Sequence, residues 1–197
     1  MKFIESILLH DGMYQNLDLH QSRVNLAFDT TSSHRTPLDL KLILPKRRLK
    51  GKYKVRIVYD LENKASFDLN YEVYKPREIK SLEVVNSKPF DYSQKYEDRS
   101  RINELKAQSN ADDIIICIDG KITDSSYANL AFFDGSSWYT PQNPLLNGVR
   151  RQQLLARKRL IEKPFFVSDI SHFQKVSLIN AMLDLGDISI KSDHIHF

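Results

Sequence analysis

ITDSSYANLAFFDG (Ile122–Gly135) places an acid and an asparagine around four small or hydroxylated residues, between two runs that have the composition of strands. Asp-Gly pairs flank the central part of this region, at Asp119-Gly120 and at Asp134-Gly135. Asp-Gly is typical of tight hairpin turns, because glycine accepts a positive φ at little cost. The stretch therefore predicts a β-meander in which residues 124–128 form a polar bulge. A polar bulge inside a β-meander usually aims its side chains at a target.

Outside the meander, alternating apolar residues predict further strands, and capping residues predict a few helices. The meander itself is expected to use the strands Ile114–Ile118, Lys121–Thr123, Ala128–Phe133 and Trp138–Thr140. Other expected strands are Phe3–Leu9, Met13–Leu17, Tyr53–Tyr59, Phe67–Tyr74, Ile79–Val85, Phe165–Val167, Val176–Met182 and Ile188–Ile190. Helices are expected after Asp18, after Pro37, at Arg99–Gln108 and from about Gly148.

A polar, proline-containing segment, Asn86–Ser100, is the best candidate for a connection between domains. The sequence therefore predicts an α+β protein in two lobes. Residues 1–88 would form a small N-terminal α/β lobe, and residues 89–197 a larger C-terminal lobe.

Composition narrows the class of protein. The 197 residues are 41 % hydrophobic and 27 % charged, which is ordinary for a soluble globular protein. The single cysteine, Cys117, excludes an internal disulfide and a multi-cysteine zinc site, and the six histidines show no metal-binding spacing. No run approaches the ~20 apolar residues of a membrane span, and the N-terminal residues do not resemble a signal peptide. We expect a cytoplasmic protein without a metal site or membrane contact.

The net charge of +4 is concentrated in two basic runs, Pro45–Lys54 and Arg150–Arg159. Such runs are compatible with nucleic-acid binding. The second run contains Leu154 and Leu155, however, and reads as an amphipathic helix with a solvated basic face. It also lacks the interleaved aromatic residues of single-strand binders. We therefore expect no nucleic-acid partner.

Two features are candidates for chemistry. Lys95 lies in the segment between the expected lobes, where ligands commonly bind, although a solvated linker lysine is the ordinary alternative. In Pro141–Leu155, Gly148 leads directly into a helix, and a helix N-terminus suits a phosphate. The alternative there is an ordinary junction between a loop and a helix.

The order of these pieces resembles the class IV aminotransferase family of pyridoxal-phosphate enzymes. ADDIIICIDGKITDSSYANLAFFDG (Ala111–Gly135) resembles the family's Ala-Asp-Glu, apolar strand, glycine turn and Val-Thr-Glu, followed by Asn-(Ile/Leu)-Phe. WYTPQNPLLNGVRRQQLL (Trp138–Leu155) resembles its Tyr-Thr-Pro and Gly-Ile-Thr-Arg. FIESILLHDG and LDLHQSR, between Phe3 and Arg23, resemble its Phe-Glu-Thr, Asp-Gly and His-x-x-Arg.

The resemblance runs from about Phe3 to Leu185 and implies a fold as well as a cofactor. The fold would be fold type IV, as in D-amino-acid aminotransferases, with a small α/β lobe and a larger pseudo-barrel lobe. The cofactor, pyridoxal 5'-phosphate, would lie between the lobes. The resemblance also implies a homodimer that acts on a small-molecule substrate.

The family's roles carry over to individual positions. Lys95 falls at the lysine that is covalently linked to the cofactor aldehyde. Arg23 would bind the cofactor phosphate through a forked contact. Val149 and Arg150 would offer backbone N–H groups to the same phosphate. Asp124 falls at the family's glutamate, which pairs with the protonated pyridine nitrogen.

Further positions would shape the site around the ring and the substrate. Ser126, Ala128 and Asn129 would lie beside the ring, and Asn180 would lie on the substrate side. Asp124 is one methylene shorter than the family's glutamate. The stretch YDLENKASFDL (Tyr59–Leu69), at the place of the family's substrate loop, has no arginine or glycine.

A substrate carboxylate would therefore need another cation, and Arg56, Arg77 and the Arg150 side chain are the alternatives. The small size of the chain is most like 4-amino-4-deoxychorismate lyase, which releases pyruvate and leaves 4-aminobenzoate for folate synthesis. An aminotransferase for a D- or branched-chain amino acid is the alternative enzyme. A family member that has kept the fold without catalysis is the third hypothesis.

Overall fold

The computed structural model describes residues 1–30, 36–61 and 67–197. It consists of two compact units. Unit 1 comprises Met1–Lys75 and Gln94–Asp98, and unit 2 comprises Pro76–Ser93 and Arg99–Phe197. Residues 62–66, the middle of the stretch Tyr59–Leu69, lie outside the described residues. No helix among the described residues is long and apolar enough to cross a membrane.

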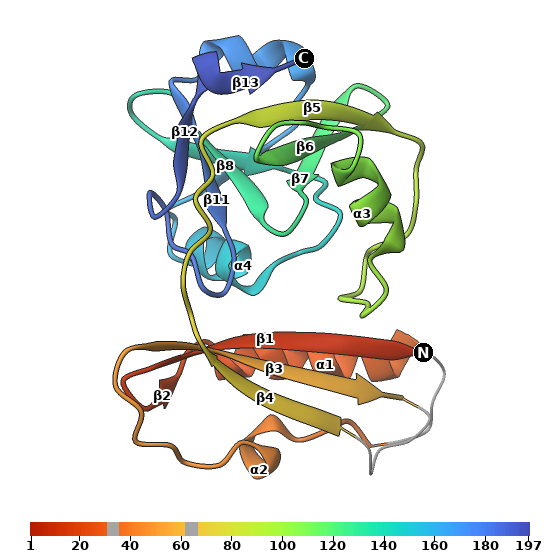
Figure 1. The fold of residues 1–197 in the computed structure, drawn as a ribbon, viewed down its shortest axis with the longest axis vertical. Helices are drawn as coiled ribbons and strands as arrows, with labels where there is room; N and C mark the ends of the chain where they lie inside the picture. Colours follow the sequence, from red (N-terminus) through yellow and green to blue (C-terminus); the bar gives the residue numbers. More distant parts are fainter. Residues whose placement is uncertain (31–35, 62–66) are drawn as a thin grey trace. The chain divides into compact units, whose positions relative to one another are not determined.

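Unit 1 is an antiparallel sheet with a helix across one face (Figure 1). Its strand order is β2-β1-β3-β4, so both hairpins expected from the sequence are confirmed. Its elements are β1 (Lys2–His10), β2 (Met13–Tyr14), α1 (Leu17–Thr30), α2 (Leu40–Ile43), β3 (Lys52–Asp60) and β4 (Phe67–Val73).

The core of unit 1 follows from the alternation in β1. Phe3, Ile7 and Leu9 point to one face and are at most 1 % exposed, where they join Val24 and Phe28 of α1. Successive strand residues alternate between faces, so every second position of β1 faces this helix. The same face also carries Glu5, a buried acid among apolar residues.

Gln94–Asp98 is separated in sequence from unit 1 but belongs to its sheet. The backbone N–H of Ile4 donates to the carbonyl of Lys95 at 2.9 Å, and Phe3 forms an antiparallel bridge with Tyr96. This short stretch therefore extends the sheet next to β1.

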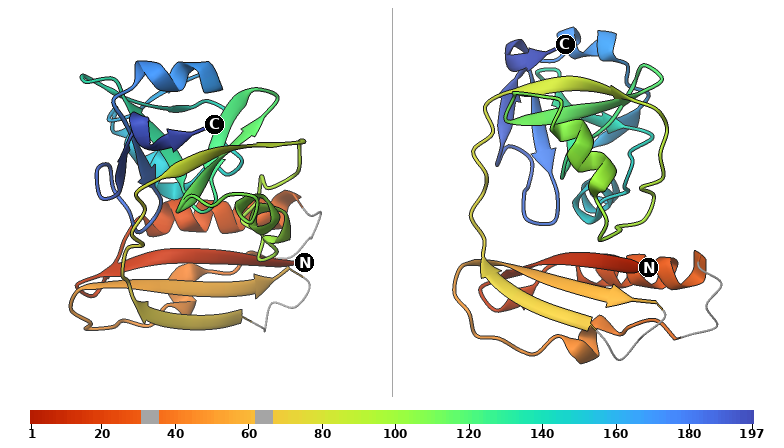
Figure 2. Two further views of the ribbon diagram at one scale, coloured as in Figure 1. Left: turned by 45° about the horizontal axis from the view of Figure 1, so that its top comes forward. Right: turned by 45° about the vertical axis from the view of Figure 1, so that its right-hand side comes forward.

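Unit 2 contains the remaining strands. Within the described residues it forms a nine-stranded sheet, in which β11 and β12 run steeply across the direction of β5 and β6 (Figure 2). Its elements are β5 (Leu82–Ser87), α3 (Ser100–Lys106), β6 (Asp113–Ile118), β7 (Lys121–Ser125), β8 (Asn129–Phe133), β9 (Trp138–Pro141), α4 (Val149–Ala156), β10 (Ile161–Lys163), β11 (Lys175–Ile179), β12 (Ser189–Lys191) and β13 (Ile195–His196), with 3₁₀ turns at Val167–His172 and Ser192–His194.

The division of the chain differs from the 88/89 boundary that the sequence suggested. β5 pairs in parallel with β6 from Leu82 to Ser87, so it belongs to unit 2 although it precedes the polar segment. The polar segment then supplies Gln94–Asp98 to unit 1. The division depends on pairing between strands that are far apart in the sequence, and the local composition does not reveal this pairing.

Three local expectations are corrected. Residues 124–128 are not a bulge within a strand: Asp124 pairs with Asn129, and the residues between them form the turn that joins β7 to β8. The irregularity lies instead in the β6–β7 pairing, between Ile115 and Cys117. The strand expected at Phe165–Val167 is also absent from the described residues, where β10 ends at Lys163.

The third correction concerns the basic helix. α4 covers eight residues and ends at Ala156, so it takes in only the first part of the basic run. Arg151 is 2 % exposed and does not lie on a solvated face.

Candidate functional site

Asp124 is the centre of a buried polar cluster in unit 2. It is the penultimate residue of β7 and is 6 % exposed. Its Oδ1 accepts a hydrogen bond from Asn129 Nδ2 at 2.7 Å, and its Oδ2 accepts from the backbone N–H of Leu146 at 2.9 Å. Both donors are neutral, and together they fix the orientation of the carboxylate.

The cluster changes the acidity of Asp124. Burial raises the pKa of this carboxyl group from 3.8 to about 6, although the donors from Leu146 and Asn129 and the charge of Arg151 lower it in part. Burial acts in this direction because it disfavours the charged form. With this pKa, Asp124 is mostly ionised at pH 7 and can accept a hydrogen bond from a protonated base.

The turn after Asp124 is tightly built. Ser125 Oγ accepts from the N–H groups of Tyr127 (3.3 Å) and Ala128 (3.0 Å), and Ser125 N–H donates to the Ala128 carbonyl at 2.8 Å. Ser126 and Ala128, expected beside a cofactor ring, are therefore brought to the Asp124 end of the β7–β8 hairpin. A rigid turn of this kind holds the carboxylate and its neighbours in one arrangement.

Gly148 brings the start of α4 against the same cluster. A Cβ built on Gly148 would lie only 2.1 Å from Asn129 Oδ1. Its φ is −67°, so the position needs glycine for space and not for backbone conformation. The expected helix start at Gly148 is confirmed, since Gly148 is the N-cap of α4.

The N-terminus of α4 has no side-chain cap. Val149 and Arg150 are its first residues, so their backbone N–H groups belong to the set that a helix leaves without an internal partner. These groups and the positive end of the helix dipole suit an anion.

Arg151 was not singled out in the sequence, yet it anchors the loop that reaches Asp124. Its Nη1 donates to Asn147 Oδ1 at 2.9 Å, and its Nη2 donates to the Pro141 carbonyl at 2.9 Å and to Glu162 at 2.5 Å. These bonds hold both ends of the 141–147 loop, which supplies the Leu146 N–H. Arg151 therefore positions a donor to Asp124 and also adds positive charge nearby.

Asn180 and the Arg150 side chain lie at another edge of this cluster. Ile179 of β11 pairs with Asn129, so Asn180 directly follows the residue beside Asn129. Asn180 Oδ1 accepts from the backbone N–H of Met182 at 2.9 Å and holds its own turn. The Arg150 side chain donates to Gln153 at 2.7 Å. The sequence thus selected three stretches that unit 2 brings together, namely Asp124–Asn129, Val149–Arg150 and Asn180.

Unit 1 contains a second buried cluster, around Glu5. Its carboxylate accepts from Arg23 Nε at 2.7 Å and from Arg23 Nη2 at 2.6 Å, which is a forked contact. His20 Nδ1 lies 2.6 Å from Glu5 Oε2. Glu5 and His20 are 0 % exposed, and Arg23 is 9 % exposed.

The charges in this cluster are fixed. Burial alone would raise the pKa of Glu5, but the charge and hydrogen bonds of Arg23, together with His20, hold this pKa at about 2. Burial lowers the pKa of His20, and the charges of Arg23 and Lys95 lower it further, against the opposing effect of Glu5. His20 is therefore neutral at pH 7 and donates from Nδ1 to Glu5. Lys95 is half-buried and close enough to act on His20.

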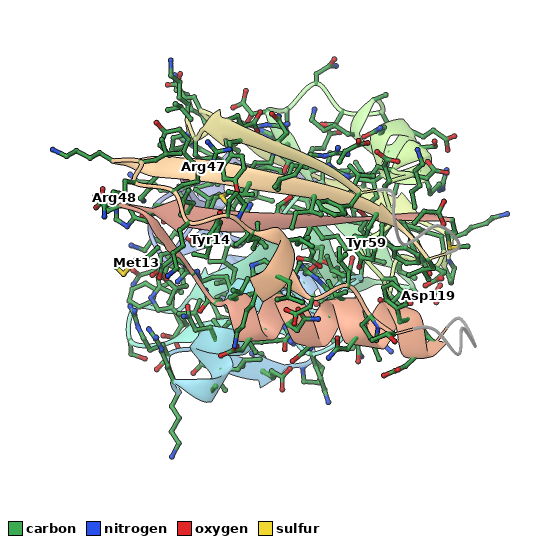
Figure 3. The ribbon with its side chains drawn as sticks, turned by 90° about the horizontal axis from the view of Figure 1, so that it is seen from below. Met13, Tyr14, Arg47, Arg48, Tyr59 and Asp119 are labelled. Atoms are coloured by element: carbon green, nitrogen blue, oxygen red, sulfur yellow. The ribbon has the colours of Figure 1, made fainter. Side chains whose placement is uncertain are left out.

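The first basic run lies away from this cluster. Figure 3 shows Arg47 at the end of unit 1 where Tyr14 lies, with Tyr59 towards the other end of the sheet. The Arg47 guanidinium lies 5.1 Å over the ring of Tyr71, whose hydroxyl is 2.7 Å from that of Tyr14. Burial raises the pKa of both Tyr14 and Tyr59, together with Tyr71 at Tyr14 and with Glu5 at Tyr59. The unit 1 sheet thus has one polar group around Tyr14, Tyr71 and Arg47, and a separate one around Glu5 near Tyr59.

A signal for Glu5 was present in the sequence. In FIESILL the acid takes a core-facing position of an alternating strand, and such a position requires a buried partner. His20 and Arg23 are three positions apart on a helix, so they share the face that meets this strand. No comparable signal marked the burial of Arg151.

The family of the chain follows from comparison with known proteins. The model of the class IV aminotransferases matches residues 2–190, nearly the whole chain. The chain belongs to the class IV aminotransferase family. The family resemblance and the expected enzyme class are thereby confirmed.

Individual members of the class IV aminotransferase family are similar over most of their length. An uncharacterised protein from Haemophilus influenzae is 34 % identical over 183 residues, which cover 90 % of this chain and 96 % of that protein. The crystal structure of a proposed 4-amino-4-deoxychorismate lyase from Haemophilus somnus 129pt is 31 % identical, with a TM-score of 0.86, and the match covers 93 % of this chain and 97 % of that one. The predicted fold type is confirmed by this likeness.

A hypothetical aminotransferase from Mycobacterium tuberculosis, solved in its PLP-bound form, shares the class IV fold at 16 % identity. Its TM-score is 0.73, and the match covers 98 % of this chain and 81 % of that one. Membership of this family implies that the chain binds a small-molecule substrate.

The residues of this class IV chain fit pyridoxal phosphate on structural grounds. The uncapped start of α4 suits the phosphate, and the ionised, oriented carboxylate of Asp124 suits a protonated pyridine nitrogen. Gly148 joins these two features, because it places the helix start against Asn129, the partner of Asp124.

Proposed function

We propose that the protein is a pyridoxal-phosphate-dependent lyase that converts 4-amino-4-deoxychorismate to 4-aminobenzoate and pyruvate, a step of folate synthesis. The observation that carries the proposal is the buried Asp124 carboxylate, held beside an uncapped helix N-terminus. Similarity to the proposed lyase from Haemophilus somnus supports this substrate. The cofactor, when bound, would supply an electron sink for the carbon that loses a proton.

Three groups would hold the cofactor. Asp124 would accept the hydrogen bond of the pyridinium, and its donors from Asn129 and Leu146 would keep the shorter side chain in one orientation. The N–H groups of Val149 and Arg150 would bind the phosphate. Arg23 would contribute its guanidinium to the binding of the phosphate. Its forked contact with Glu5 uses Nε and Nη2, which lie along one edge of the guanidinium.

Lys95 would carry the proton transfer. Once the amino group of the substrate had replaced Lys95 Nζ on the cofactor aldehyde, the freed lysine amine would take the proton from the carbon that bears the substrate amino group and would help to expel pyruvate. Ser126 and Ala128 would lie beside the ring at the end of the β7–β8 hairpin. Asn180 would lie on the substrate side.

The second candidate is an aminotransferase for a D- or branched-chain amino acid. The same lysine would move the proton, and the same carboxylate would serve the ring, so only turnover separates the two reactions. A catalytically degenerate member is the third possibility, motivated by the arginine-free stretch Tyr59–Leu69. The proposal also includes a cytoplasmic location and a homodimer. Sedimentation of the purified protein would test the homodimer.

The decisive experiment is covalent trapping. Purified protein is mixed with pyridoxal phosphate, treated with borohydride and digested, and the modified peptide is identified by mass spectrometry. We expect the adduct on Lys95 and none in Lys95→Ala. Cofactor-loaded protein that has not been reduced is given aminodeoxychorismate in one sample, and an amino acid with a 2-oxo acid in another. Absence of an adduct in wild type would refute the cofactor, and amino transfer without pyruvate release would refute the lyase.

A further inference from the structure

A substrate of the proposed reaction carries carboxylate groups, and the inference in this section rests on that proposed function. A carboxylate is best recognised by an arginine that offers two parallel N–H donors. The sequence left three arginines as alternatives for this role: Arg56, Arg77 and the Arg150 side chain. The structure distinguishes them by their existing partners.

Two of the three are already paired with acids. Arg56 Nη2 lies 3.2 Å from Glu97 in unit 1. Arg150 Nη1 lies 3.4 Å from Asp184 in unit 2 and also donates to Gln153. A substrate carboxylate would have to displace or share these partners, which reduces the gain from binding.

Arg77 has a different environment. It precedes β5 in unit 2, its side chain is exposed, and its guanidinium lies 4.9 Å from the centroid of the Tyr127 ring. No salt bridge to Arg77 occurs among residues 1–30, 36–61 and 67–197. Stacking occupies the face of a guanidinium and leaves the N–H donors along its edge directed outwards.

Tyr127 ties Arg77 to the candidate cofactor site. Tyr127 lies in the turn between Asp124 and Asn129. The hydrogen bond between the side chains of Asp124 and Asn129 closes the β7–β8 hairpin. The next residue back, Ser126, accepts a hydrogen bond at its carbonyl from Arg99 Nη2. The turn is therefore contacted by two guanidinium groups. Arg99 is bound to the backbone of the turn, whereas the contact of Arg77 is with the Tyr127 ring.

We propose that Arg77, stacked on Tyr127, binds a carboxylate of the substrate. The ring holds the guanidinium next to the Asp124 turn without neutralising it, so the full charge is kept for an incoming anion. The ligand class is a carboxylate-bearing amino or oxo compound. Arg77 takes the role that the arginine-free substrate stretch does not fill.

The test measures carboxylate affinity and cofactor attachment on separate portions of each purified variant, with pyridoxal phosphate in the portion that is treated with borohydride. The probe is 2-oxoglutarate, with 4-methyl-2-oxopentanoate as a monocarboxylate of similar size, each titrated into protein loaded with pyridoxamine phosphate. Arg77→Gln should weaken binding of at least one probe by about tenfold to a hundredfold, the range for a hydrogen-bonded charge. For the natural reaction, KM should rise while kcat changes little, because the contact is made equally in ground and transition states.

Matched variants separate binding from structure. Arg157→Gln removes an exposed arginine from the other end of α4 and should leave both affinities unchanged. Tyr127→Phe keeps the stacked ring and should bind like wild type, whereas Tyr127→Leu should weaken binding in the same direction as Arg77→Gln. Arg77→Lys should restore part of the affinity, because it returns the charge but not the fork.

The outcomes separate the inference from the proposed function. Unchanged affinity for both probes in Arg77→Gln, with borohydride trapping on Lys95 intact, would overturn the role of Arg77 and leave the proposed function standing. Failure of wild type to trap the cofactor would overturn both. Weaker binding with intact trapping is the expected result.

Discussion

Glu5 in unit 1 and Asp124 in unit 2 are both buried carboxylates, but their partners differ in charge. Glu5 receives a forked contact from Arg23, a permanent cation, and its pKa is about 2. Asp124 receives hydrogen bonds from an amide and a backbone N–H, which are neutral, and its pKa is raised to about 6 by burial. Burial is nearly the same in both, so the charge of the nearest donor decides the direction of the shift.

The comparison teaches what each cluster can do. The pair in unit 1 keeps its charges over the whole physiological pH range and fixes the position of Arg23. The carboxylate in unit 2 titrates close to neutrality, so its charge responds to whatever approaches it. A carboxylate of the second kind is the one suited to a protonated ring nitrogen.

The largest effect is expected from Glu5→Gln, which removes the buried carboxylate that pairs with the Arg23 guanidinium in unit 1. Removing one member of a buried pair costs about 3–5 kcal/mol of unfolding free energy. Urea unfolding of the cofactor-free protein measures it. The control Glu72→Gln breaks the partly exposed pair with Lys54 and should cost less than about 1 kcal/mol. A loss for Glu5→Gln no larger than this control would contradict the assignment.

Asp124→Asn sharpens the comparison through pH. The pKa of Asp124 is raised on folding, so the folded state binds more protons than the unfolded state between about pH 4 and 6. Stability should therefore fall as pH rises through this window, by about 3 kcal/mol for a shift of about two units. Glu5 acts oppositely, because its lowered pKa stabilises above about pH 4.5 and this contribution is lost towards pH 2.

In Asp124→Asn the decrease in stability between pH 4 and 6 should disappear from the cofactor-free protein. Unfolding free energies at closely spaced pH values would show it. Asp119→Asn, in a tight turn with φ of 50° that asparagine also adopts, should keep the wild-type profile. An identical profile in Asp124→Asn and wild type would refute the raised pKa.

Gly148→Ala tests the packing that holds the neutral donor beside Asp124. The new methyl group would meet Asn129 Oδ1 at 2.1 Å, and such overpacking costs about 1–3 kcal/mol. Chemical denaturation measures the cost. In an Asn129→Ser background the same substitution should cost less than half as much, because the side chain in the way is shorter. Equal cost in both backgrounds would show that another contact is responsible.

The smallest effect is expected from Arg151→Met. This substitution should increase the difference between the pKa of Asp124 and that of Glu5. The charge of Arg151 lowers the pKa of Asp124, so its removal should raise that pKa above about 6. Carboxyl ¹³C NMR titration of the folded protein reports it directly. Arg157→Met, an exposed arginine at the C-cap of the same helix, is the matched control. A pKa of Asp124 that stays the same would limit Arg151 to anchoring the loop.

Much of the local structure could be read from the sequence. The hairpins at Asp11-Gly12 and Asp119-Gly120 follow from residues that tolerate positive φ, and all four positions have it in the structure. The start of α4 at Gly148 was also indicated, whereas the turn between β7 and β8 was expected to be a bulge. The site residues of unit 2 came from the order of motifs, and their roles toward a cofactor stay predictions.

The remaining features depended on contacts that the sequence does not mark. Leu146 reaches Asp124 across 22 positions, and Arg23 reaches Glu5 across 18. The burial of Arg151 comes from the loop that folds over it, although its neighbours in the basic run suggest a solvated face. β5 joined unit 2 through parallel pairing with β6, which no local pattern shows.

The sequence by itself determined the Asp-Gly turns, the start of α4 and the family, because turn chemistry, alternation and motif order are properties of short segments. Only the tertiary structure decided which charges are buried and what they face. Desolvation depends on everything packed around a group, and the charge of its donors depends on which distant segment arrives. For that reason two carboxylates of similar burial, Glu5 and Asp124, have pKa values on opposite sides of the ordinary range.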